Sequence, residues 1–463
     1  MSTTYDALII GTGQAGPSLA GRLAGSGMKV AIVERGPFGG TCVNNGCTPT
    51  KAMVASAYAA HVTRRASDYG VISSGEPSVD LRRVKARKDA IVASSRDPLE
   101  QWLAGLENGR VFRGHARFVG PDTVDVNGTE ITAEKIFLNV GGRPRIPPFP
   151  GIDATPYLTN ISMMDLDVLP EHLIVVGGSY VGLEFAQMFR RFGSHVTVVE
   201  MGPRLVARED EDVSLAIQDF LRAEGISFRL DAMCISLLNG PEGVSVNVNC
   251  REGAPRELGS HVLLAVGRVP NTDDLGLDRA GIRTDKSGYI EVDESLRTSN
   301  PNVWALGDCN GKGAFTHTAY NDYEIVADNV LSQAGRKYTD RVPVYALFTD
   351  PPLGRIGMNE ADIRKLGLQA LVGKRPMTRV SRAIEKGETN GFLKIYTEAT
   401  SGRILGASLL GTGADEAVHS LLDAVYARTP HQQVQSHVRI HPTVSELLPT
   451  TMEQLTPLSS AKV

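Results

Sequence analysis

An internal repeat is the feature of the sequence that most constrains the fold. Residues 7–36 align without a gap on residues 173–202. The matched positions are Gly11, Gly16, Gly27, Glu34 and Gly36 in the first copy and Gly177, Gly182, Gly193, Glu200 and Gly202 in the second. Each copy has an apolar segment, a glycine turn, a helical pattern and a second apolar segment that ends in glutamate. This order predicts two βαβ units of the kind that bind dinucleotides.

Both copies have the residues that dinucleotide binding needs. Glycines let the backbone approach a pyrophosphate, and the helix N-terminus places partial positive charge beneath it. The terminal glutamate can accept hydrogen bonds from a ribose. One glycine motif is weak evidence, because tight glycine turns also occur in unrelated α/β units. Two motifs in register, each with its glutamate 23 residues after the first glycine, are strong evidence, even with Ser179 at a position usually held by glycine.

The rest of the chain is long enough for further domains. With 463 residues, two or three hydrophobic cores are expected. Helical patterning is expected to about residue 70 and again over 80–104, where Pro98 predicts a bend or a boundary. Beyond about residue 341 we expect a separate α+β domain. Its strands are predicted near 344–349, 392–397 and 403–411, and its helix at 415–427.

The composition argues against several functional classes. A net charge of -4 gives no reason to expect nucleic acid or an anionic membrane as a partner. No run of 18 apolar residues predicts a transmembrane helix, and the apolar run Ala7-Leu8-Ile9-Ile10 is too short for a signal peptide. Five cysteines in so long a chain do not make a disulfide scaffold. A cytoplasmic protein is therefore expected.

The segment from Gly39 to Lys51 contains two cysteines, Cys42 and Cys47, at the start of a helical pattern. They can bridge if the first helical turn is distorted, and a helix N-terminus lowers a thiol pKa into the reactive range. Zinc needs two further ligands, which no second Cys-x-x-Cys motif or nearby histidine provides. A redox-active pair without a metal is therefore expected, with inert buried thiols as the alternative. The remaining cysteines are interpreted as small packing residues: Cys234, Cys250 and Cys309.

With these motifs, essentially the whole chain resembles the flavoprotein disulfide reductases, such as dihydrolipoyl dehydrogenase, glutathione reductase and mercuric reductase. The resemblance implies an α/β fold with two Rossmann-like dinucleotide-binding domains and a C-terminal α+β dimerisation domain. FAD would bind residues 1–147 and 276–340, and NAD(P)H would bind residues 148–275. Residues 341–463 would form the interface of a homodimer.

The resemblance also implies roles for single residues. Cys42 matches the interchange thiol that attacks the substrate, and Cys47 matches the thiol that lies against the flavin. Lys51 matches a lysine at the reactive edge of the flavin, although by itself it resembles a solvated helix residue. The implied FAD-binding positions are Gly11, Gly13, Gly16, Glu34, Gly40, Thr41, Lys51, Gly141, Gly307 and Asp308. The implied NAD(P)H-binding positions are Gly177, Gly182, Glu184, Glu200 and Gly267.

Two connecting turns also match the family, namely Asn139-Val140-Gly141-Gly142 and Ala265-Val266-Gly267-Arg268. The first departs from the usual Ala-Thr-Gly of the family. By itself, an apolar strand followed by Gly307-Asp308 is a common signal for a turn. The resemblance implies that these two residues belong to the second FAD-binding motif of the family.

A second chemical motif lies near the C-terminus, where His441 is followed five residues later by Glu446. By itself, His-Pro at such a position is more often a turn, and it can hold a cis peptide bond. In the family this pair exchanges protons with the substrate sulfurs and comes from the partner subunit. We therefore expect His441 and Glu446 to be the acid–base pair across a homodimer.

The nicotinamide and the acceptor are less constrained. Glu200 favours NADH, because a carboxylate accepts from a ribose 2′-hydroxyl and repels a 2′-phosphate. Arg204 either softens this preference or belongs to a surface turn. Arg439 either favours an anionic acceptor or forms a salt bridge at the interface.

No cysteine follows Cys309, so the tail pair of mercuric reductases and large thioredoxin reductases is missing. Residues 320–323 and 348–353 nevertheless look most like mercuric-reductase-like flavoproteins. We expect a small disulfide, a metal ion or a related small-molecule acceptor. The alternatives are a dihydrolipoyl dehydrogenase, a flavin NADH oxidase or quinone reductase, and a non-catalytic subunit.

Overall fold

The first copy of the repeat forms the centre of a seven-stranded sheet in the computed structural model, which describes residues 3–72, 75, 77–249 and 255–458. The strand order is β3-β2-β1-β6-β5-β4, and β16 pairs with the end of β6. The strands are β1 Thr3–Ile10, β2 Val30–Glu34, β3 Gly109–Arg113, β4 Ala116–Phe118, β5 Thr123–Val126, β6 Thr129–Leu138 and β16 Val303–Ala305. β1 and β2 are parallel and almost wholly buried, as expected for strands covered on both faces.

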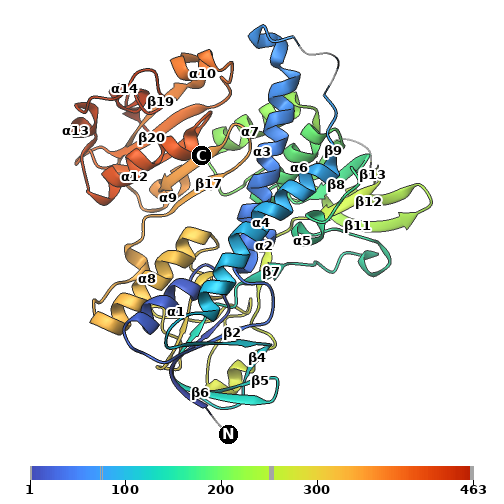
Figure 1. Cartoon of the computed structure of the whole chain (residues 1–463). Helices are drawn as coiled ribbons and strands as arrows, with labels where there is room; N and C mark the ends of the chain where they lie inside the picture. Colours follow the sequence, from blue (N-terminus) through green and yellow to red (C-terminus); the bar gives the residue numbers. More distant parts are fainter. Residues whose placement is uncertain (1–2, 73–74, 76, 250–254, 459–463) are drawn as a thin grey trace.

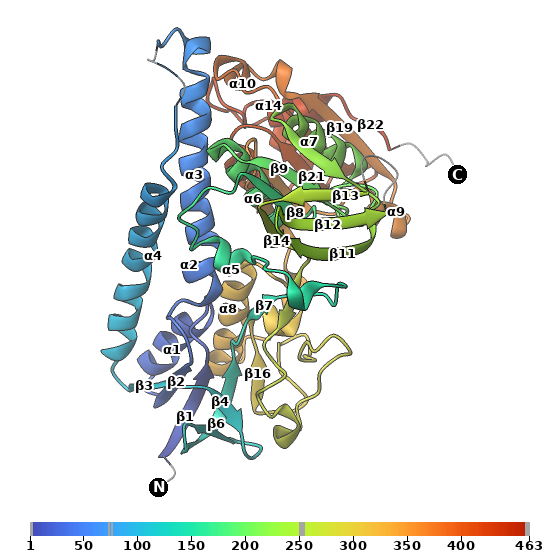
Figure 2. The same ribbon diagram turned by 90° about the vertical axis from the view of Figure 1, so that its right-hand side faces the viewer.

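Five helices accompany this sheet: α1 Gly16–Gly25, α2 Gly40–Asn45, α3 Cys47–Arg64, α4 Leu81–Ala104 and α8 Thr316–Ser332. Figure 2 shows α3 and α4 as two long helices lying side by side. Pro98 lies inside α4, so a helix boundary at this proline is wrong. The proline is exposed, and water can therefore satisfy the carbonyl group that its missing N–H leaves free.

The second copy forms a four-stranded parallel sheet in the order β10-β9-β8-β14. Its strands are β8 His172–Val176, β9 His195–Val199, β10 Ile226–Arg229 and β14 His261–Leu264. A three-stranded antiparallel sheet comes from β11 Met233–Gly240, β12 Gly243–Asn249 and β13 Arg256–Gly259, and the helices are α5 Asn160–Met163, α6 Tyr180–Phe192 and α7 Glu211–Ala223. We call the parts of the fold built on the first and the second copy of the repeat the first and the second nucleotide unit. β7 (Gly142–Pro144) pairs with β15 (Arg268–Pro270), so the two segments that connect these units lie side by side.

The last part of the chain folds into a six-stranded antiparallel sheet in the order β17-β18-β21-β20-β19-β22. Its strands are β17 Val344–Leu347, β18 Leu353–Gly357, β19 Ala370–Pro376, β20 Phe392–Glu398, β21 Ile404–Leu410 and β22 Thr456–Pro457. Its helices are α9 Glu360–Lys365, α10 Ser381–Glu385, α11 Ala414–Ala417, α12 His419–Tyr426, α13 His431–Gln435 and α14 Leu447–Glu453. The predicted helix at 415–427 is therefore two helices, and the α/β fold with a C-terminal α+β part is confirmed (Figure 1).

Short 3-10 helices complete the fold at Ala66–Tyr69, Ile152–Ala154, Leu277–Ala280, Gly307–Asn310, Tyr338–Asp340 and Met377–Arg379. Among the described residues, no helix combines the length and the apolar character needed to cross a membrane.

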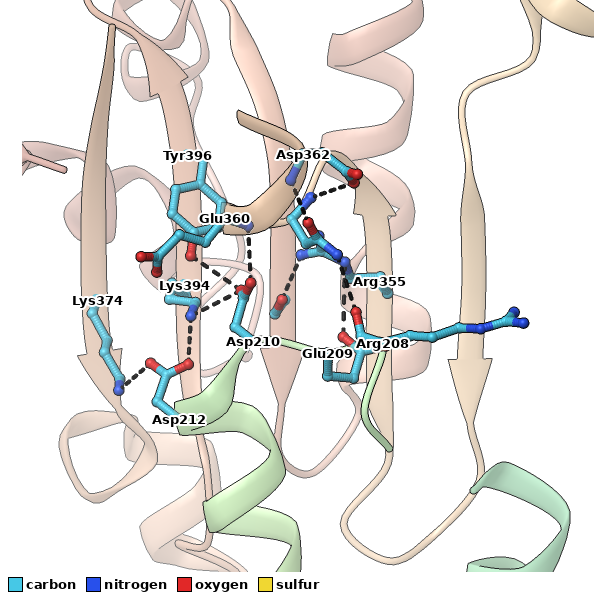
Figure 3. A network of polar contacts seen from close by, with 12 residues as sticks. Arg208, Glu209, Asp210, Asp212, Arg355, Glu360, Asp362, Lys374, Lys394 and Tyr396 are labelled. Atoms are coloured by element: carbon cyan, nitrogen blue, oxygen red, sulfur yellow. Dashed lines mark hydrogen bonds and ion pairs between the residues drawn. The ribbon is translucent and has the colours of Figure 1, made fainter. Parts of the chain in front are cut away.

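A cluster of charges, of which Asp210 and Lys394 are buried, joins the second nucleotide unit to the C-terminal sheet (Figure 3). Asp210, just before α7, lies 2.9 Å from Lys394 Nζ and accepts from the Tyr396 hydroxyl at 3.0 Å. Asp212 binds Lys394 at 2.5 Å and Lys374 at 2.6 Å. Each buried charge thus has a partner of opposite sign, which offsets its desolvation. These contacts hold α7 against β19 and β20.

Candidate active site

A large cavity of about 1390 Å³ collects most of the predicted site residues. It lies where the two nucleotide units meet the start of the C-terminal sheet. The predicted residues that line it are Gly11, Gly13, Glu34, Gly40, Thr41, Cys42, Cys47, Lys51, Gly141, Glu184, Gly267, Gly307 and Asp308. The predicted residues outside its lining are Gly16, Gly177, Gly182, Glu200, His441 and Glu446.

The two glycine turns have the same geometry. Gly11 and Gly177 have φ of +102° and +116°, where only glycine fits without strain. A Cβ atom on Gly16 would lie 2.2 Å from the Gly11 carbonyl oxygen, and one on Gly182 would lie 2.0 Å from that of Gly177. The helix therefore reaches the turn only because both members of each pair are glycines.

The two terminal glutamates also have matching roles. Glu34 accepts from the backbone N–H of Thr12 and of Gly36, both at 2.8 Å. Glu200 accepts from the N–H of Gly178 at 2.6 Å and of Gly202 at 2.7 Å. These bonds hold each carboxylate at the end of its strand, beside the glycine turn.

The two cysteines are free thiols at the junction of α2 and α3, and the Thr316 hydroxyl oxygen lies 3.1 Å from each sulfur. The pKa of Cys47 is lowered to about 6 by its hydrogen bond with Cys42, and further by Thr316 and by the charge of Lys51. The pKa of Cys42 is raised by the same Cys42–Cys47 hydrogen bond and by burial. Cys47 is therefore the sulfur of the pair on which a thiolate is stabilised.

Lys51 is not a solvated helix residue. Its Nζ lies 2.7 Å from the buried carboxylate of Glu184 and 4.6 Å from the ring centroid of Phe348. The other carboxylate oxygen of Glu184 accepts from the Phe348 N–H at 3.0 Å. These contacts fix one positive charge beside the thiols.

His441 and Glu446 form the expected pair, with His441 Nδ1 2.8 Å from Glu446 Oε2. The His441–Pro442 peptide bond is cis, as its sequence allowed. The His441 side chain is 72% exposed, and its neighbours Val438 and Ile440 are 100% and 79% exposed. This segment projects from the C-terminal part instead of lining the cavity of its own chain.

Several lining residues were not predicted. Asn139 Oδ1 accepts from the Gly16 N–H at 3.0 Å, while Nδ2 donates to the Leu306 carbonyl at 3.1 Å. Asn139, which replaces the alanine of the usual Ala-Thr-Gly, therefore links the first glycine turn to the strand before Gly307. This replacement was the sequence signal that could have identified Asn139 as a residue of the site.

Tyr180 also lines the cavity, and its hydroxyl donates to the buried carboxylate of Glu209 at 2.7 Å. The Tyr345 hydroxyl donates to the same oxygen at 2.7 Å. Burial, followed by the charge of Glu209, raises the pKa of Tyr180. Neither this cluster nor Thr316 has a sequence signal, because the members come from distant segments.

The structure provides evidence on several residues whose roles the sequence had left open. Cys309 is buried as expected, whereas Cys234 is exposed, so its interpretation as a packing residue is wrong; Cys250 lies outside the described residues. Arg204 donates to the Ala207 carbonyl at 3.1 Å in an exposed turn, which favours the surface role. Burial lowers the pKa of Arg439, and its buried Nε has no hydrogen-bond partner among the described residues.

Comparison with protein-family models defines the class of protein. The model of the pyridine nucleotide-disulphide oxidoreductases matches residues 5–322, and the model of their dimerisation domain matches residues 344–452. The chain therefore belongs to this family, whose members are FAD-dependent NAD(P)H oxidoreductases acting on disulfides or related groups.

Individual relatives match over almost their whole lengths. The chain is 34% identical to the mercuric reductase of Streptomyces lividans, covering 98% of this chain and 97% of that protein. It is 31% identical to the dihydrolipoyl dehydrogenase of Chlamydia muridarum, covering 96% of each. The solved Cu(II) complex of the HOCl-induced flavoprotein disulfide reductase RclA from Escherichia coli has a TM-score of 0.89 at 34% identity, covering 97% of this chain and 99% of that one.

Proposed function

We propose that the protein moves electrons from NADH through FAD to a Cys42–Cys47 disulfide, and from the resulting dithiol to a small disulfide, metal ion or related acceptor. One observation carries this proposal: both cysteines, Lys51 and the glycine turn of the first nucleotide unit line one cavity. In this scheme, bound FAD supplies the two-electron chemistry that links a nicotinamide to a disulfide.

The cavity residues fit FAD. Gly11 and Gly13 leave backbone exposed beside the N-terminus of α1, which suits a pyrophosphate. Glu34, held by two N–H groups, would accept from the adenosine ribose, and Asp308 would accept from the ribityl chain. Burial raises the pKa of Asp308, which is expected of a carboxyl group in a closed binding site. We infer that residues 1–147 with 276–340 bind FAD and that residues 148–275 bind the nicotinamide cofactor.

The chain's own residues would then divide the thiol chemistry. The Cys42 thiolate would attack one sulfur of a disulfide acceptor and release the other as a thiol. Cys47 would attack the Cys42 sulfur of the mixed disulfide, releasing the second thiol and restoring the Cys42–Cys47 bond. Two electrons leave the dithiol and reduce one acceptor disulfide. His441, held by Glu446, would give and take the protons at these sulfurs from across a homodimer.

The acceptor class draws support from the relatives. One is named a mercuric reductase, and the RclA structure is a Cu(II) complex. Both favour a metal ion or a small disulfide as acceptor. A dihydrolipoyl dehydrogenase is the second candidate, supported by a relative of that name.

An anaerobic titration with NADH tests the proposed electron route. We expect the holoenzyme to take up four electrons per chain, two in FAD and two in the disulfide. Lipoamide, glutathione disulfide, Hg(II), Cu(II) and quinones should then be compared by kcat/KM. Uptake of only two electrons, both held by the flavin, would refute a redox-active pair, and a clear preference for lipoamide would favour the dihydrolipoyl dehydrogenase.

The choice of nicotinamide follows from Glu200. Since its carboxylate is held at the end of β9 by two N–H groups, a 2′-phosphate would meet its negative charge. We expect kcat/KM for NADH to exceed that for NADPH by about tenfold or more. Glu200→Gln should narrow this ratio, while Glu211→Gln, an exposed control on α7, should leave it unchanged. A higher kcat/KM with NADPH would contradict the prediction.

A further inference from the structure

Arg208 lies in the segment between β9 and α7, and it lines the large cavity. Its side chain is exposed, and no described residue forms a hydrogen bond, an ion pair or a ring contact with its guanidinium group. Figure 3 shows this side chain extending away from the cluster of charges that the next two residues, Glu209 and Asp210, join. Two carboxylates are thus held by the fold, while the arginine beside them is left free for a ligand in the cavity.

The residues on both sides of Arg208 are bonded to the second glycine turn and the helix that follows it. The Val206 N–H donates to the Gly178 carbonyl at 2.9 Å. The Tyr180 hydroxyl donates to the Glu209 carboxylate at 2.7 Å. Gly178 belongs to the turn, and Tyr180 is the first residue of α6. Arg208 is therefore held beside the N-terminus of α6.

The backbone around Arg208 is fixed and not a loose loop. Val206 is buried and has a φ of +41°, a conformation that β-branched residues rarely adopt. The Glu209 N–H donates back to the Val206 carbonyl at 2.7 Å, and Asn359 Nδ2 donates to the Arg208 carbonyl at 3.0 Å. Such strain persists only where the surrounding structure determines the conformation, so the fold sets the position of Arg208.

The N-terminus of α6 is the place where a bound dinucleotide is expected to put its pyrophosphate, because the helix dipole and the free N–H groups favour an anion there. Within the described residues, the Ser179 side chain makes no capping hydrogen bond to this helix, so these N–H groups remain for a ligand. A guanidinium group can donate two parallel hydrogen bonds to phosphate oxygens. A 2′-phosphate is the less suitable partner for Arg208, because Glu200 would repel it.

We propose that Arg208 binds the pyrophosphate of the nicotinamide cofactor and, together with the N-terminus of α6, offsets its negative charge. The inference rests on the proposed use of NADH and deepens it, since it names a side chain that holds the cofactor. Arg208 makes and breaks no bond in this role. It therefore contributes to the affinity for the cofactor, and its loss should raise KM for NADH while kcat stays nearly unchanged.

The binding of ADP-ribose, which carries the pyrophosphate but no nicotinamide ring, tests this role without turnover. Its Kd is measured by calorimetry on the holoenzyme, in which FAD already fills the first nucleotide unit. Arg208→Gln should raise Kd about tenfold, because a charge-assisted hydrogen bond to phosphate is lost. Arg208→Lys, which keeps the charge without the planar fork, should give an intermediate Kd. Arg222→Gln removes the same charge from an exposed position on α7 outside the cavity lining, and it should leave Kd unchanged.

The same measurement with 2′-phospho-ADP-ribose separates the two phosphate sources. If Arg208 binds the pyrophosphate, Arg208→Gln weakens both ligands by the same factor. A loss confined to the 2′-phosphorylated ligand would overturn the inference and assign Arg208 to the 2′-phosphate. An unchanged Kd for both ligands would also overturn it, and the proposed electron route would stand, because the NADH titration uses the wild-type enzyme. If the wild-type holoenzyme binds no ADP-ribose, the nicotinamide site itself is refuted, and the role of Arg208 with it.

Discussion

Cys42→Ser is expected to lower the rate of acceptor reduction by about a thousandfold or more, because it removes the sulfur that would attack the acceptor. Cys42 lines the cavity and accepts a hydrogen bond from the Thr316 hydroxyl. Serine can keep the contact with Thr316 but cannot form the disulfide. Electron uptake in the anaerobic titration should accordingly fall from four electrons per chain to two. Steady-state rates with the best acceptor and the titration endpoint measure both effects.

Cys234 offers a matched control for this substitution. It is an exposed free thiol on β11 and does not line the cavity. Cys234→Ser should keep the wild-type rate and the four-electron endpoint. If Cys42→Ser retains acceptor reduction, the protein is instead a flavin NADH oxidase or quinone reductase that only shares the fold.

His441→Gln is expected to lower kcat by about a hundredfold to ten-thousandfold, the usual contribution of a general acid–base group. Glutamine retains a polar side chain but cannot exchange a proton near neutral pH. The ring lies 2.8 Å from Glu446 and outside the cavity of its own chain, so the proposed acid–base role requires the histidine to come from the partner subunit. His437→Gln is the matched control, since this exposed histidine precedes His441 by four residues.

Mixed dimers test whether the site is shared between subunits. One subunit carries Cys42→Ser and the other His441→Gln. In a symmetric dimer with shared sites, each mixed dimer has one site with both wild-type groups. Random reassociation of equal amounts should then restore about a quarter of the wild-type activity. No recovery from mixed dimers of confirmed composition would show that the cysteines and the histidine act within one chain.

Local patterns made much of this protein predictable. The order of apolar segments, glycines and terminal glutamates predicted both βαβ units, and the glycine pairs have the backbone geometry that this pattern implies. The close spacing of Cys42 and Cys47 indicated a reactive pair. Such signals survive in a sequence because they depend on residues only a few positions apart.

Contacts between distant segments were decided only by the tertiary structure. Thr316 reaches the sulfurs because the start of α8 approaches the junction of α2 and α3, and Lys51 is paired because α6 brings Glu184 beside it. Pro98 is accommodated within α4 because it lies on an exposed face of this helix, where water can reach the carbonyl group that the proline leaves without a partner. The sequence by itself determined the two nucleotide-binding units and the thiol pair, since glycine conformations and cysteine spacing are local properties. Only the folded chain decided the charge and proton partners of those thiols, because side-chain burial and hydrogen bonding depend on which segments meet.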